Sequence, residues 1–192
     1  SSKAEATFAT LEAQKKAAEI VAALEANDLC VTATKSLSES VKTWVGASFE
    51  VYYEVALLRG QTLVDLNQMR SAVSDQKISL DAMYSDVEAG LREGVEAEEI
   101  AAVSNDVQKN ESAVELLISQ VDQAMETLEN ECNVAVSALC GATENYNMSS
   151  LKKAGAQAVS QMRASAGTLA DLVARVEACE TQVEAIRSKL GE

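Results

Sequence analysis

The sequence lacks proline and histidine altogether. Its 192 residues include no proline, although average usage would give roughly ten, so no helix in the chain is interrupted by this residue. Without histidine, the usual serine and cysteine catalytic triads and a Glu-x-x-His di-iron set are excluded. The sequence therefore predicts a protein that is not an enzyme.

Aromatic residues, long apolar runs and positive charge are also scarce. Aromatic residues make up 4% of the chain, and 16 basic residues face 30 acidic ones, for a net charge of −14. This charge argues against nucleic-acid binding, which needs Lys and Arg to neutralise phosphates. No apolar run reaches the roughly 18 residues of a membrane-spanning helix. The start SSKAEATF is unlike a signal peptide, and the end IRSKLGE is unlike a hydrophobic anchor signal.

Alanine and glutamate dominate what is present. They number 32 and 22, together 54 of 192 residues. Much of the 47% apolar content is therefore alanine, which favours helices and has little surface to bury. That apolar content is nevertheless too high for a fully disordered chain.

Apolar residues recur at alternating steps of four and three in three long segments, the heptad pattern of packed helices. The pattern predicts helices over residues 37–91, 96–140 and 149–190. The two steps from Leu58 through Thr62 to Leu66 are both of four residues, a stutter that relaxes supercoiling. Near the end of the second segment, Cys132 and Leu139 take over the apolar stripe. Residues 1–36 are less regular and predict a short helix over about 3–26 followed by a bend.

Helix length and loop length together predict the architecture. At about 1.5 Å per residue the three long helices are roughly 60–80 Å long, and short connections make neighbours antiparallel. We therefore expect an all-α fold in one domain, residues 1–192: an elongated three-helix bundle with a fourth short helix thickening one end. We also expect a monomer in dilute solution.

Four cysteines allow three disulfide pairings. Cys132 and Cys140 are about 12 Å apart along one helix, too far to bridge. We prefer a Cys30–Cys140 bridge at the thick end. Cys132 and Cys179 are then either buried free thiols or, if the last helix is interrupted near Gly155 or Gly167, a second bridge. An even cysteine count favours an oxidising compartment.

Two polar residues occupy core positions of the heptad pattern. Pairing the first two long helices around the turn at 93–95 places Asn110 close to Gln76. A buried contact between these two amides would fix the register of the helices at some cost in stability.

Other side chains offer candidate surfaces. Trp44, Tyr52 and Tyr53 gather near the thick end, where they either fill the core or form a distal binding surface. Asn147 begins an N-x-S sequon in a predicted loop and is the glycosylation candidate; Asn110 begins another but lies in the core. The glutamates of segment 93–99 predict a solvated helix start rather than a metal site, and no cofactor is expected.

The composition and the long heptad helices resemble a known family. The stretches AEATFATLEAQKKAAEIVAALEA and EGVEAEEIAAV make the chain similar to the glutamic acid/alanine-rich surface coat proteins of trypanosomes, which belong to a helical-bundle surface glycoprotein superfamily. The resemblance implies a lipid-anchored protein on the extracellular face of the cell, packed among neighbouring copies with its C-terminus toward the membrane.

Three functions remain open on these grounds. The leading hypothesis is a non-enzymatic cell-surface coat protein of a parasite, forming a dense protective layer. The alternatives are a surface receptor that binds a host macromolecule at its membrane-distal end, and an intracellular coiled-coil adaptor that dimerises through its heptads. A lipid-binding bundle that opens on a membrane is a further possibility.

Overall fold

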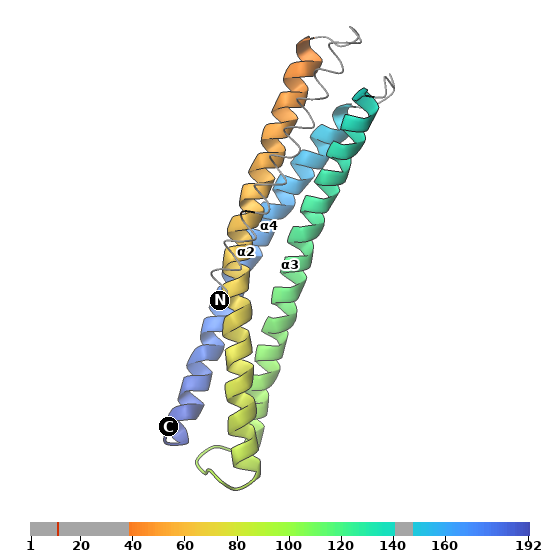
Figure 1. The fold of residues 1–192 in the computed structure, drawn as a ribbon. Helices are drawn as coiled ribbons and strands as arrows, with labels where there is room; N and C mark the ends of the chain where they lie inside the picture. The colour runs from red at the N-terminus through yellow and green to blue at the C-terminus, as the bar shows by residue number, and fades with distance from the viewer. Residues whose placement is uncertain (1–10, 12–38, 141–147) are drawn as a thin grey trace.

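The described part of the chain is an all-helical bundle. A computed structural model describes Leu11 and residues 39–140 and 148–192, with side chains from residue 54 onward apart from 56, 132–133, 135–140 and 148. Three helices occupy these ranges: α2 (Glu39–Glu88), α3 (Ala97–Cys140) and α4 (Met148–Lys189). They run side by side along the rod (Figure 1), and the described residues contain no strand.

The helices are joined by burial of one apolar stripe from each. The stripe follows the heptad steps because residues three and four apart share one face of a helix. The fully buried large side chains include Leu66, Leu80, Ile100, Leu128, Leu151, Met162 and Leu172. All three helices contribute to this single core, which runs along the axis of the rod.

The stutter in α2 is accommodated without breaking the helix. Thr62 occupies the extra core position and is only 7% exposed. Its hydroxyl donates to the carbonyl oxygen of Leu58, 2.8 Å away, so the buried polar group is satisfied within its own helix.

Glycine ends α2 and α4 in the same way. Gly90 and Gly191 have φ values of 72° and 80°, in the left-handed region that glycine adopts without strain. After α2, the amide of Leu91 donates to Asp86 over 2.8 Å and that of Gly90 to Val87 over 3.1 Å. These are the two bonds of a Schellman motif. The predicted end at residue 91 was three residues too long because the motif closes the helix at Glu88.

The turn between α2 and α3 packs against the end of α4. A Cβ atom on Gly94, which has a φ of 117°, would lie 2.5 Å from the main-chain oxygen of Lys189. Only glycine allows this close approach of two backbones. The turn and the last turn of α4 therefore meet at one end of the rod.

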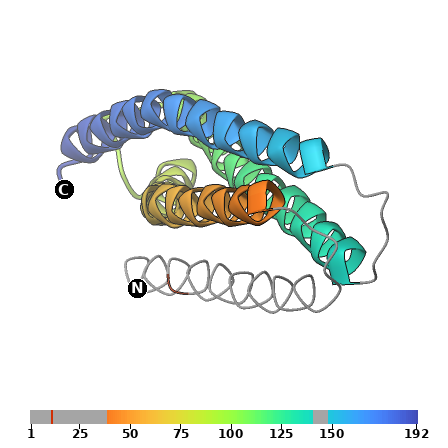
Figure 2. The ribbon, with the colours of Figure 1, turned by 90° about the horizontal axis from the view of Figure 1, so that it is seen from above.

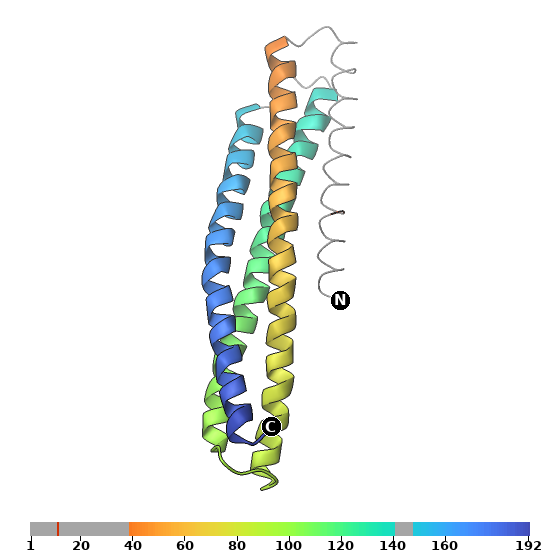
Figure 3. The same cartoon turned by 90° about the vertical axis from the view of Figure 1, so that its left-hand side faces the viewer.

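The rod has two different ends. The α2–α3 turn and the C-terminus lie at one end, and the start of α2, the end of α3 and the start of α4 lie at the other (Figure 1, Figure 3). Seen from above, the last part of α3 leads away from the start of α4 (Figure 2). The predicted fourth helix over residues 3–26 lies outside the described residues, apart from Leu11, which is helical and exposed.

Candidate functional site

A polar layer crosses the core where the sequence placed two amides. Gln76 on α2 is 1% exposed, Asn110 on α3 is 3% exposed, and Cys179 on α4 is 4% exposed. The Nδ2 of Asn110 donates to the Sγ of Cys179 at 3.4 Å. The Nε2 of Gln76 donates to the carbonyl oxygen of Val176 at 3.1 Å. Both amides thus bond to α4, whereas the sequence analysis expected them to bond to each other.

One atom of this layer has no partner. The Nε2 of Gln76 also donates to a carboxylate oxygen of Glu180, 3.2 Å away, but its Oε1 accepts no hydrogen bond. A buried acceptor without a donor costs about 1–3 kcal/mol. The polar layer therefore combines specific hydrogen bonds with one buried oxygen that lowers the stability of the fold.

Cys179 is a buried free thiol. Burial raises its pKa, and the nearby carboxylate of Asp106 raises it further, while the Asn110 amide and Arg175 act in the opposite direction. A thiol with a raised pKa is a weak nucleophile because the thiolate is the reactive form. Cys179 borders a cavity of about 190 Å³ between α3 and α4, yet its chemistry suits packing better than catalysis.

The other predicted disulfide residues lie elsewhere. Cys132 and Cys140 are on α3, but their side chains are outside the described residues, as is the whole of Cys30. Helix α4 runs unbroken through Gly155 and Gly167, so the break that would have brought Cys179 to Cys132 does not occur. Cys179 instead lies beside Asn110, roughly 33 Å along α3 from Cys132 at the usual helical rise.

The remaining candidates of the sequence analysis are only partly described. Trp44, Tyr52 and Tyr53 lie on α2, at the end of the rod away from the turn, and their side chains are outside the described residues, as is Asn147. In the acidic segment 93–99, Glu99 pairs with Lys189 at 2.9 Å. Within the described ranges, no three His, Cys, Asp or Glu side chains are grouped so that they could hold a metal ion.

Sequence reasoning missed a cleft between α3 and α4. It has a volume of about 370 Å³ and is lined by glutamines and small residues: Gln120, Gln123, Ala124, Thr127, Ala154, Gln157, Ala158 and Gln161. Glutamines beside the small core residues Ala124 and Ala158 were the available signal. Small core side chains leave space between the two helices, and amide side chains border it.

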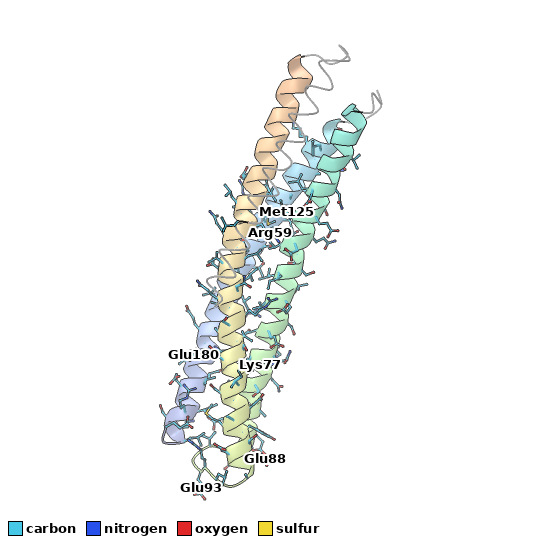
Figure 4. All side chains as sticks on the ribbon, in the orientation of Figure 1. Arg59, Lys77, Glu88, Glu93, Met125 and Glu180 are labelled. Atoms are coloured by element: carbon cyan, nitrogen blue, oxygen red, sulfur yellow. The ribbon has the colours of Figure 1, made fainter. Side chains whose placement is uncertain are left out.

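Sequence reasoning also missed a row of ion pairs in which every cation belongs to α2 and every carboxylate to α3. Three cations of α2 pair with three carboxylates of α3, each over 2.8 Å: Arg59 with Asp122, Arg70 with Glu115, and Lys77 with Glu111. Figure 4 shows Arg59 near the middle of the rod and Lys77 closer to the turn. The row adds a small electrostatic attraction to the packing of α3 against α2. The hydrogen bond from Lys77 lowers the pKa of Glu111.

A further group of charges closes the end of the rod that holds the turn. Arg92 of the turn lies 3.2 Å from a carboxylate oxygen of Asp86 and 2.5 Å from one of Glu192. Glu192 also lies 3.5 Å from Arg187. The last residue of the sequence is thereby held against the turn.

Comparisons with family models, curated proteins and solved structures find no match. In the described part of the chain, no helix is both long and apolar enough to span a lipid bilayer.

Proposed function

We propose that the protein is a non-enzymatic cell-surface coat protein of a parasite, standing upright among many copies of itself in a dense protective layer. The observation that carries this proposal is the placement of the C-terminus beside the α2–α3 turn at one end of the rod (Figure 3). A lipid anchor attached beyond the C-terminus would leave the other end pointing away from the membrane.

The dimensions of the rod suit such a layer. Helices of 50, 44 and 42 residues extend over about 60–75 Å, while each is only about 10–12 Å across. An upright bundle covers little membrane area for its height. Many copies can therefore stand close together and keep large molecules away from the membrane.

The acidic surface suits the same role. With a net charge of −14, copies repel one another, which opposes aggregation. At physiological salt this repulsion is screened within about 8 Å. It therefore keeps the copies apart in dilute solution and still allows them to stand as close neighbours.

The end of the rod opposite the α2–α3 turn would form the outer surface of the layer. In this proposal, the sequence-predicted helix over residues 3–26, the Cys30–Cys140 bridge and a glycan on Asn147, all of which lie outside the described residues, belong to the outer end of the layer. They would make this end wider than the membrane-proximal one. A wide outer end would shield the narrower rods beneath it.

The test is the location of the protein on its own cells. A small membrane-impermeant amine-reactive reagent, which can enter a dense layer, should label the protein on intact, unpermeabilised cells, and a phospholipase that cleaves glycolipid anchors should release the protein into the medium. Labelling only after permeabilisation would overturn the proposal and favour the intracellular adaptor. As the control, a cytosolic protein must remain unlabelled on the intact cells.

A further inference from the structure

We propose that neighbouring copies contact one another side by side, with the basic first half of α4 in one copy against the acidic second half of α3 in the next. The inference rests on the proposed function only for the parallel alignment of the copies. The contact itself follows from how charge is distributed over the rod.

The first half of α4 carries positive charge only. Residues 148–170 contain Lys152, Lys153 and Arg163 and no acidic residue, and all three are exposed. Lys152 and Lys153 form no ion pair within the described ranges. Arg163 lies 3.6 Å from a carboxylate oxygen of Glu54, and its side chain remains 72% exposed. This basic stretch is unusual in a chain with almost twice as many acidic as basic residues.

The second half of α3 carries negative charge only. Residues 119–140 contain four acidic residues and no basic one. Asp122 is paired with Arg59 of α2. Glu126 is exposed and has no ion pair with any residue whose side chain is described. Glu126 thus remains as an exposed carboxylate on this half of α3.

The two charged stretches lie at the same height along the rod. Residues 120–127 of α3 and 154–161 of α4 line opposite sides of one cleft. Because the two helices are antiparallel, Glu126 lies only about 4 Å along the axis from Lys152 and Lys153. Two copies standing parallel, with their ends level, therefore present a basic surface and an acidic surface to each other at matching heights.

The contact between two copies is weak because it consists of exposed ion pairs. Exposed ion pairs contribute little individually and are screened by salt, so the contact does not hold two copies together in dilute solution. Tethering in a layer raises the local concentration into the millimolar range. There, the same pairs set which sides of neighbouring rods face each other.

The test uses the full chain tethered through a C-terminal polyhistidine tag to a supported bilayer of neutral lipid and nickel-chelating lipid. The bilayer supplies the alignment, so the result does not depend on where the protein resides in the cell. A carbodiimide joins an amine directly to a carboxylate in contact with it. With an equal mixture of ¹⁵N-labelled and unlabelled copies, mass spectrometry identifies the crosslinks that join two copies.

We expect mixed-isotope crosslinks between Lys152 or Lys153 and the acidic side chains of segment 122–131. The double variant Lys152→Glu with Lys153→Glu should lower their yield at least about fivefold, as should raised salt. Mixing this variant with a Glu126→Lys, Glu129→Lys variant should restore crosslinks between the same positions, because the charges are then exchanged.

The matched control is the double variant Lys109→Glu with Arg175→Glu. It gives the same net charge, but the changes lie in the half of the rod nearer the turn, so the crosslinks should persist. Equal loss in the control would show that net repulsion alone is responsible and would overturn the proposal. So would mixed-isotope crosslinks spread evenly over the surface, or binding of the untethered chain through Lys152 and Lys153 to vesicles of anionic lipid. Helix content by circular dichroism verifies that each variant is folded.

Discussion

Replacing Gln76 by methionine should stabilise the protein. Gln76→Met removes an acceptor that is buried without a partner, a gain of about 1–3 kcal/mol. It also buries a more apolar side chain of similar size, worth about 1–2 kcal/mol. Against this stand two lost hydrogen bonds, to the Val176 carbonyl and to the Glu180 carboxylate, together about 2–3 kcal/mol.

The balance is a gain of about 1 kcal/mol because the groups left behind need no new partner. The Val176 carbonyl lies within α4 and can accept from its own helix, and the Glu180 side chain is exposed and can be hydrated. For a chain of this length, such a gain raises the melting temperature by about 2–4 °C. Thermal unfolding followed by circular dichroism measures it.

The variant Gln76→Glu provides the opposite perturbation. Its carboxylate would be buried beside Glu180, so its pKa in the folded state would be raised above that in the unfolded state. Relative to the wild type, the variant should be destabilised by several kcal/mol at neutral pH. The deficit should shrink as pH falls through the folded-state pKa and disappear below the unfolded-state pKa near 4.3.

A loss of more than about 1 kcal/mol in Gln76→Met would refute this reasoning. It would mean that the Gln76 amide is a net stabilising contact and that its oxygen is satisfied in solution. A deficit of Gln76→Glu that does not change with pH would show that the side chain at this position reaches water.

Three further predictions concern the turn, the surface and the thiol. Gly94→Ala should lower the free energy of unfolding by more than about 2 kcal/mol, because φ at this position is positive and the added Cβ would meet a backbone oxygen of α4. Gly90→Ala also has a positive φ but open space around its Cβ, so it should cost about 1–2 kcal/mol. Denaturant unfolding measures both. Lys77→Ala should cost at most about 1 kcal/mol, since the pair is exposed. Because the pKa of Glu111 is lowered, the contribution of the Lys77–Glu111 pair to stability should be present above the unfolded-state pKa of the carboxylate and fade as pH falls. If the cost of Lys77→Ala does not change in acid, the ion pair is not its cause. Cys179 should react with iodoacetamide much more slowly in the native than in the denatured protein, and rapid labelling of the native protein would show that the core is open there. Since the pKa of Cys179 is raised in the folded state, its contribution to stability should decline once pH exceeds the unfolded-state pKa of about 8.5.

The sequence determined the helices and their limits. With no proline to stop them, the segments continued for as long as the heptad steps did. Glycine then ended α2 at Gly90 and α4 at Gly191. The burial of Gln76 and Asn110 also followed from their place in the repeat, because periodicity states which side chains face inward.

The tertiary structure decided what those inward side chains meet. In a bundle of three helices, a core residue of one helix faces two others, and the heptad pattern does not distinguish between them. Gln76 and Asn110 were each expected to contact the other, and both bond to α4 instead. The pairing of cations on α2 with carboxylates on α3, and the cleft lined by glutamines, likewise depend on which flanks of the helices adjoin. That is a property of helices packed in three dimensions, since the period of a single helix carries no information about the angle at which its neighbours approach.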